Sequence, residues 1–242
     1  MYQRRLLKMI FFGIVLMYVG WHFVLKRPVY QRLYGTPNPT RLEIADADLF
    51  QDLPEQSIIP ININGYDIEI QAIKKFSTTT SIVYVDRYSS LGTWYRSSEG
   101  AALYDKIVPQ DISTATGVSG RHPECFKYSH EYRGLETEYS GYYSDRCPQT
   151  IFKNSEGEIS NNHSIAASTN VQRGLDILKA GDIASIEGYA VYWNGTGNLR
   201  YQRFESAVTA GQVSTQLAGG RKTGLCRQLL ITKITFDGYT FE

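Results

Sequence analysis

The feature that most constrains this chain is an apolar segment close to its N-terminus. From Met9 to Leu25 the residues read MIFFGIVLMYVGWHFVL, and none of them carries a formal charge. A helix rises about 1.5 Å per residue and a membrane span needs about 17 to 25 apolar residues, so this run lies at the short end of that range. The sequence therefore predicts a transmembrane helix over residues 9–25, preceded by a short tail, residues 1–8.

The flanking residues favour a retained signal anchor over a cleaved signal peptide. The apolar run is longer than an ordinary h-region, and the residues that follow it, KRPVY, contain no small-x-small cleavage site. Basic residues are nearly balanced on the two sides, so the positive-inside comparison decides little, and the short tail favours an inside N-terminus. We expect a single-pass membrane protein with an extracytoplasmic domain.

The rest of the chain divides into a spacer and a folded part. Residues 26–57 show little periodicity and contain four prolines, which predicts a stalk, with a short amphipathic helix possible over residues 42–53. Residues 58–242 are enough for one sizeable core, with possible lobes at 58–169 and 170–242.

Composition favours a mainly β fold with a few short helices, an α+β domain. The chain has 18 tyrosines and 21 glycines among 242 residues, which is typical of strands with many turns. Short strands with small-residue faces suit a compact barrel or sandwich, and an OB-like barrel is possible in the C-terminal part. The formal net charge is only +1, so no global field attracts nucleic acid, and we expect no nucleic-acid partner.

Local patterns predict several elements. Isoleucines alternate before and after Asn64-Gly65, which predicts a β-hairpin with a type I′ turn, and residues 81–88 are predicted to form the next strand. Pro109 suits a helix start and Gly117 the position just past a helix end, so Asp111 reads as a helix-turn residue.

The C-terminal third shows a helix followed by strands. Asn170 is the expected N-cap and Gly181 the C′ residue of a helix over 170–181. Residues 183–193 and 226–236 are predicted strands, because they are rich in β-branched and aromatic residues.

Three cysteines allow one bridge. In an oxidising compartment a Cys125–Cys147 disulfide would close a loop of roughly 23 residues and contribute about 3 kcal/mol. Cys226 would then be left over, and three unrelated reduced thiols are the alternative. The chain has no CxxC, HExxH or clustered Cys/His spacing, so we expect no metal site.

Cys226 and His163 form the sharpest catalytic hypothesis. A thiolate nucleophile needs a base or a cationic environment, and Arg221, Lys222 and Arg227 are near Cys226 in the sequence. A cysteine at the start of a strand is more often a small core residue, so we expect a non-enzymatic protein. No phosphate-binding loop or dinucleotide fingerprint is present, and we expect no cofactor.

A tyrosine-rich segment lies between Cys125 and Cys147. With the interleaved Lys127 and Arg133, its rings could stack on sugars or bases, although such residues more often line a small β core. The candidate ligand-binding residues are Tyr128, Tyr132, Tyr139, Tyr142 and Tyr143.

Several segments in order resemble a family of uncharacterised bacterial single-pass membrane proteins, with coverage from about residue 58 to 236. That family combines an N-terminal anchor with a Pro-x-Asp segment, an Asn-x-His segment, a Gly-Asp strand and a Gly-x-Cys strand. The matching residues are Pro109 and Asp111, Asn161 and His163, Gly181 with Asp182 and Gly188, and Gly224 and Cys226.

This chain departs from the family pattern at two places. Thr116 precedes Gly117 where the family shows Trp-Gly, and Arg227 follows the cysteine where the family usually has an acidic residue. The resemblance implies a membrane-anchored envelope domain without a known activity.

From the sequence we therefore expect a membrane-anchored envelope scaffold or accessory subunit that binds protein partners. One alternative is a membrane-tethered hydrolase or transpeptidase that uses the pair Cys226 and His163. A second alternative is a glycan- or oligonucleotide-binding barrel, which rests on the tyrosines.

Overall fold

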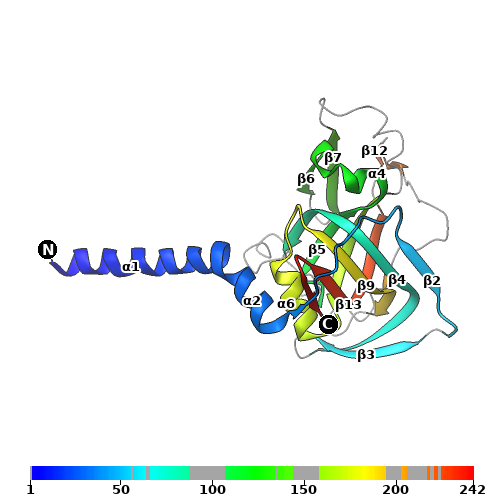
Figure 1. The fold of residues 1–242 in the computed structure, drawn as a ribbon, viewed down its shortest axis with the longest axis horizontal. Coiled ribbons are helices and arrows are strands. Elements are labelled where there is room, and N and C mark those ends of the chain that lie inside the picture. Colours follow the sequence, from blue (N-terminus) through cyan, green and yellow to red (C-terminus); the bar gives the residue numbers. More distant parts are fainter. Residues whose placement is uncertain are drawn as a thin grey trace.

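The computed structural model describes residues 2–55, 57–63, 66–87, 107–133, 136–143, 158–194, 203–205, 217–218, 221–222 and 225–242. A single helix, α1 (Tyr2–Gly20), projects from a body built mainly of strands (Figure 1). Its course continues through a π-helical segment, η1 (Trp21–Leu25), into α2 (Lys26–Tyr34). Within the described residues, no helix combines the length and the apolar character needed to cross a membrane. The span expected over residues 9–25 is divided between α1 and η1.

The body confirms the predicted class, a mainly β fold with a few helices. Ten strands form one mixed sheet: β1 (Thr36–Pro37), β2 (Leu49–Asp52), β3 (Ile58–Ile63), β4 (Tyr66–Arg87), β5 (Gln110–Ala115), β8 (Ile159–Ala166), β9 (Ile183–Asn194), β10 (Arg203–Glu205), β13 (Leu225–Phe236) and β14 (Tyr239–Phe241). Two small hairpins pair β6 (Phe126–Arg133) with β7 (Glu136–Tyr143) and β11 (Leu217–Ala218) with β12 (Arg221–Lys222). The other helices among the described residues are α4 (Gly117–Arg121), η3 (Pro123–Cys125) and α6 (Thr169–Ile177).

Five strands of the large sheet close into a ring. In order around the ring, β4 pairs with β5, β5 with β8, β8 with β13, β13 with β9, and β9 with β4. All of these pairs are antiparallel except β8 with β13, which is parallel. In the sequence, α6 lies between β8 and β9, the third and fourth of these five strands along the chain, and it forms part of their connection.

The inside of the ring is the main hydrophobic core. Ile112, Ile186 and Leu229 from three different strands belong to one buried cluster with Val171 and Leu175 of α6. Successive residues of a strand point to opposite faces, so the neighbours of Ile112 and Leu229 lie on the outer face of the ring. That face carries a second, smaller buried cluster: Ile68, Ile70, Ile107, Val108, Ile165, Val191 and Leu230.

The segment before β2 closes one end of the ring. The amide of Ala45 donates to the carbonyl of Thr79, and the ring of Phe50 lies 5.2 Å from that of Phe76 in the core. Asp48 of this segment forms an ion pair with Arg227, and each of these two side chains is only 6 % exposed. The guanidinium of Arg227 also lies 5.1 Å from the ring of Phe50.

Several local predictions meet different outcomes. The hairpin is confirmed, since β3 pairs with β4 and Ile63 lies opposite Tyr66 across the two-residue connection. The strand expected over 81–88 is not separate, because β4 runs unbroken from Tyr66 to Arg87 and pairs with β9 along its middle. The helix expected over 42–53 is wrong, since β2 occupies Leu49–Asp52.

The segment between Pro109 and Gly117 is also not a helix. It forms β5, which pairs with β4 on one side and β8 on the other, and Gly117 begins α4 with a φ of 58°. The helix expected over 170–181 is found as α6, but its N-cap is Ser168, whose hydroxyl accepts from the amide of Val171. The strands expected over 183–193 and 226–236 are confirmed as β9 and β13.

Residues 26–52 pack onto the body, so the predicted stalk is wrong over most of its length. Arg27 of α2 pairs with Asp182 at 2.9 Å and with Asp237 at 3.1 Å, and β1 pairs with β14. The amide of Gln31 donates to Asp237 at 2.8 Å; this hydrogen bond and the charge of Arg27 lower the pKa of Asp237 below its ordinary value. Polar contacts therefore join α2 to the body.

Candidate functional site

Two rows of polar residues cross the outer face of four neighbouring strands of the ring. The strand register aligns the members of each row from β4 through β5 and β8 to β13. The first row is Asp86, Asp111, His163 and Gln228, and the second row is Tyr84, Ser113, Asn161 and Cys226. We call these eight residues the polar rows.

Asp111 and His163 form the centre of the polar rows. The Oδ1 atom of Asp111 lies 2.6 Å from Nδ1 of His163, and the carboxylate is 1 % exposed against 17 % for the imidazole. The amide of Asn161 donates to the other carboxylate oxygen of Asp111 at 3.3 Å. Burying a carboxylate is costly unless it is paired and hydrogen-bonded, so this cluster is a built polar site in the wall of the barrel.

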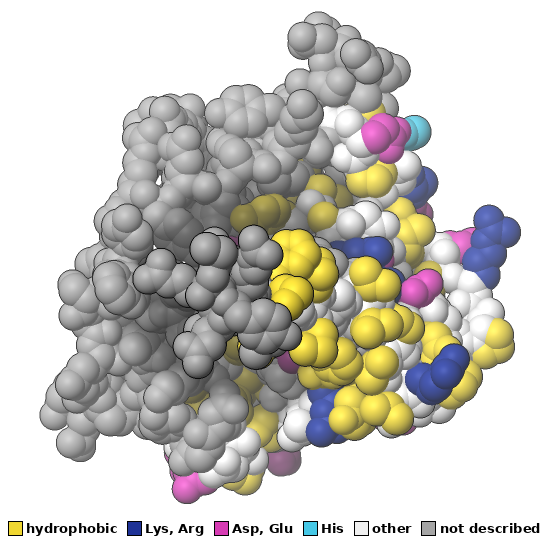
Figure 2. Space-filling model, turned by 90° about the vertical axis from the view of Figure 1, so that its left-hand side faces the viewer, with side chains coloured by type: hydrophobic (Ala, Val, Ile, Leu, Met, Phe, Trp, Pro, Cys, Tyr) yellow, Lys and Arg dark blue, Asp and Glu magenta, His cyan; other side chains and the backbone are white. Residues whose placement is uncertain are grey.

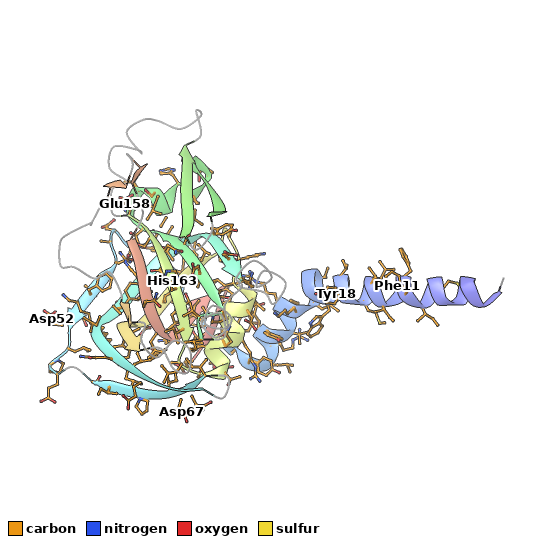
Figure 3. The ribbon with its side chains drawn as sticks, turned by 180° about the vertical axis from the view of Figure 1, so that it is seen from behind. Phe11, Tyr18, Asp52, Asp67, Glu158 and His163 are labelled. Carbon is orange, nitrogen blue, oxygen red and sulfur yellow. The ribbon has the colours of Figure 1, made fainter. Side chains whose placement is uncertain are left out.

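Figure 3 places His163 among the strands of the body, while Phe11 and Tyr18 extend from the projecting helix. Ser113, Asn161 and Gln228 are at most 5 % exposed. Tyr84 has a raised pKa, first because burial disfavours the phenolate and then because Asp86 is negatively charged. The polar rows therefore combine acidic, amide, hydroxyl and imidazole groups in a largely buried surface.

The two residues of the catalytic hypothesis lie on adjacent parallel strands. Cys226 is in register with Asn161, and His163 is in register with Gln228, so Cys226 and His163 are diagonal neighbours on one face. Arg227 belongs to the opposite face, where it pairs with Asp48, and it cannot supply the cationic environment expected around Cys226.

Asp111 is the site residue that the sequence reading set aside. Its position after Pro109 suggested a helix turn, whereas the structure places it in β5 opposite His163. The Pro-x-Asp, Asn-x-His and Gly-x-Cys segments were the available signal, since they contribute Asp111, Asn161 with His163, and Cys226 to the same rows.

The five tyrosines fall in the β6–β7 hairpin. Its register assigns four of them to one face of the hairpin and Tyr142 to the other; the four are Tyr128, Tyr132, Tyr139 and Tyr143. Their role in binding stays a prediction.

Cys125 is disulfide-bonded, and it lies at the end of η3 directly before β6. The partner predicted from the sequence, Cys147, lies outside the described residues. The hairpin pairs Phe126, the residue after Cys125, with Tyr143. The pairing of Cys125 with Cys147 stays a prediction.

Metal ligation is not indicated by the part of the chain that the structure describes. No group of three or more His, Cys, Asp and Glu side chains there could hold an ion.

Comparisons with known proteins add no assignment. No protein-family model matches this chain, and neither the curated proteins nor the solved structures contain a match. The resemblance to bacterial single-pass membrane proteins therefore stays a prediction.

Proposed function

We propose that this chain is a membrane-attached binding module of the cell envelope, and that the polar rows are its ligand-binding face. The observation that carries the proposal is the alignment of eight polar residues across the outer face of a closed barrel. Stability alone does not require such a face, because an apolar surface would be cheaper to bury.

The order of strands in the ring supports a binding role. When the five strands are numbered along the sequence, their order around the ring is 1-2-3-5-4, which corresponds to β4, β5, β8, β13 and β9. The third and fifth strands, β8 and β13, are parallel, and the helix α6 follows the third. An OB-like barrel has the same order of strands, and in such barrels oligonucleotides and oligosaccharides bind across the second and third strands. Here those strands are β5 and β8, which carry Asp111, Ser113, Asn161 and His163.

An oligosaccharide is the ligand that best fits these groups. Carboxylate, amide and imidazole side chains can exchange hydrogen bonds with sugar hydroxyls. A nucleic acid would require several cationic contacts to its phosphates, whereas the chain has a net charge of +1 and the polar rows contain two acids. The centre of a protein interface is usually depleted of charged groups, unlike this face.

The binding proposal predicts a selective loss in one of two matched asparagine variants. Replacing Asn161 with alanine should weaken binding of a chitooligosaccharide about tenfold, or about 1.4 kcal/mol, because Asn161 lies in the polar rows. Isothermal titration of the full chain in detergent measures this change. Asn38→Ala is the control, since it removes an amide–hydroxyl bond to Thr240 outside this face.

Two results would redirect the binding proposal. Equal affinities of Asn161→Ala and Asn38→Ala would place the sugar elsewhere on the molecule. A second result would be that the chain binds no oligosaccharide and that one protein is cross-linked through the polar rows. This result would identify the chain as the protein-binding scaffold instead.

We also propose that residues 9–25 attach the module to a membrane. Most of their described side chains are exposed, with Phe11 and Met17 each 70 % accessible. Figure 2 views the molecule from the side toward which α1 projects and shows hydrophobic side chains gathered there. Exposed apolar surface of this extent marks a membrane or protein contact.

The attachment predicts flotation with lipid vesicles. The full chain should float with phosphatidylethanolamine–phosphatidylglycerol vesicles and resist carbonate extraction, because burying several large apolar side chains contributes about 1.5–3 kcal/mol each. Replacing Phe11, Ile14 and Met17 with serine should abolish flotation, while a triple serine variant of the exposed Leu33, Leu49 and Ile58 should still float. Unchanged flotation of the first variant would exclude this segment as the anchor.

A further inference from the structure

We propose that the side of the body beside the anchor binds the headgroups of anionic phospholipids through the ammonium groups of Lys26 and Lys179. This inference rests on the membrane attachment of residues 9–25 proposed above, and it adds a lipid class and a second contact to that attachment. The residues that carry it are called the basal cluster: Lys26, Arg27, Lys179, Asp182 and Asp237.

The helix α2 begins directly where the apolar segment ends. Because α1, η1 and α2 follow one another without a break, Lys26 and Arg27 come immediately after Leu25. At about 1.5 Å per residue, Arg27 lies about 3 Å along the helix from the last apolar residue. The headgroup region of each leaflet is about 5–8 Å thick. With the apolar segment in the hydrocarbon region, the first turn of α2 therefore lies among the headgroups.

The body is fixed to this first turn of α2. Arg27 pairs with Asp182 at 2.9 Å and with Asp237 at 3.1 Å. Asp182 follows α6 and accepts a hydrogen bond from the backbone amide of Lys179 at 3.0 Å, and Asp237 lies in the turn between β13 and β14. Figure 1 shows α2 and α6 together on the side of the body from which α1 projects. Both acidic connections therefore lie at the level of Arg27.

Lys26 and Lys179 are cations of the basal cluster without an acidic partner. Nζ of Lys26 lies 5.3 Å from the centroid of the Tyr30 ring, about one turn further along α2, and Lys179 is exposed. Among the described residues, neither ammonium group forms an ion pair. Both positive charges are therefore available to an anion that approaches this side of the body.

The charge of Lys179 acts at the same place as that of Arg27. The pKa of Asp237 is lowered by the hydrogen bond from Gln31, then by Arg27, and then by the charge of Lys179. Arg27 itself lies between two carboxylates, which compensate its charge. The lysines of the basal cluster therefore supply the positive charge for a lipid phosphate.

A lipid headgroup fits these two lysines better than a soluble anion does. Each lysine close to an anionic membrane surface increases affinity about fivefold, which corresponds to about 1 kcal/mol. A lysine offers a phosphate a point charge, without the bidentate geometry by which arginine recognises that group. The adjoining apolar segment compensates for this, because it holds the chain at the surface where the lipid phosphates are concentrated.

The experiment is native mass spectrometry of the full chain in detergent, titrated with phosphatidylglycerol and separately with phosphatidylcholine. The first phosphatidylglycerol should bind about 25-fold more tightly than the first phosphatidylcholine, because two lysines contribute about fivefold each. Lys26→Gln and Lys179→Gln should each reduce this preference about fivefold, and the double variant should remove it. Lys179→Arg should keep the preference, since it keeps the charge.

The matched control is Lys75→Gln. Lys75 is an exposed lysine of β4, in register with Gln51 of β2. Figure 3 shows the next residue of β2, Asp52, on the side of the body away from α1. This variant should bind phosphatidylglycerol as the wild type does.

Three results would overturn the proposal. They are equal affinities of the wild type for the two lipids, an unchanged preference in the double lysine variant, and equally tight binding of soluble glycerol phosphate, which would make this a site for a soluble anion. Flotation distinguishes this contact from the anchor, because the double lysine variant should still float with vesicles. A wild type that does not float would refute the attachment, whereas equal lipid affinities in a chain that floats would refute the headgroup contact alone.

Discussion

Replacing Asp48 with alanine should lower the free energy of unfolding by about 3–5 kcal/mol, because the change leaves a buried guanidinium without its partner. The side chains of Asp48, in the segment before β2, and of Arg227 are each 6 % exposed. Asp48 receives the charge-assisted hydrogen bond of Arg227, and few solvent molecules can replace it there. Urea unfolding of the full chain in detergent, followed by tryptophan fluorescence, measures the loss.

The matched control is Asp46→Ala. Asp46 pairs with Arg121, but the two side chains are 93 % and 43 % exposed, so the same truncation should cost less than about 1 kcal/mol. The double variant Asp48→Leu with Arg227→Met should recover most of the stability, since an apolar pair of similar volume can replace a buried ion pair. Equal losses for Asp48→Ala and Asp46→Ala would mean that Arg227 is solvated.

Replacing Gly188 with alanine should cost about 3 kcal/mol or more, because the new methyl group would overlap the backbone of the neighbouring strand. An ideal Cβ at Gly188 lies 2.0 Å from the carbonyl oxygen of Leu230 and 3.0 Å from Cα of Ile231. A backbone cannot rotate away as a side chain can. The strain falls on the pairing of β9 with β13, which is the contact that closes the ring.

Thermal and urea unfolding of Gly188→Ala should show this loss. Gly20→Ala is the control, because no atom lies within 4 Å of an ideal Cβ at Gly20. Within a helix, alanine is more favourable than glycine by about 0.5–1 kcal/mol, so this variant should not lose stability. If Gly188→Ala unfolds with the same free energy as the wild type, separating β9 from β13 costs no free energy. The ring would then be open in solution.

Local sequence patterns predicted the structure correctly where a strand pairs with the strand next to it in the sequence. The Asn64-Gly65 turn requires only two flanking strands, and both strands form as expected. The segment from Pro109 to Gly117 failed because its helix signals are local, whereas β5 forms through pairs with β4 and β8. Residues 110–115 have few apolar side chains, so their composition did not indicate a central strand.

The sequence indicated only part of the candidate site, because the rest depends on pairing between distant strands. Cys226 and His163 were recognisable as reactive residue types, but only the strand register shows that they share a face. Asp111 required the correct assignment of β5 before its contact with His163 could be inferred. The docking of α2 depends on Arg27 and two acids 155 and 210 positions away, which no local pattern contains.

The docking of α2 also limits how far the β-rich body can move relative to the N-terminal helix. A flexible stalk over residues 26–57 would give it a root-mean-square reach of about 30 Å. Clamped by Arg27, Gln31 and the pairing of β1 with β14, the barrel instead moves with its N-terminal helix as one unit. In the membrane attachment and ligand binding that we propose, the polar rows would then stay at one fixed distance from the anchor, and a ligand would have to be delivered to that distance.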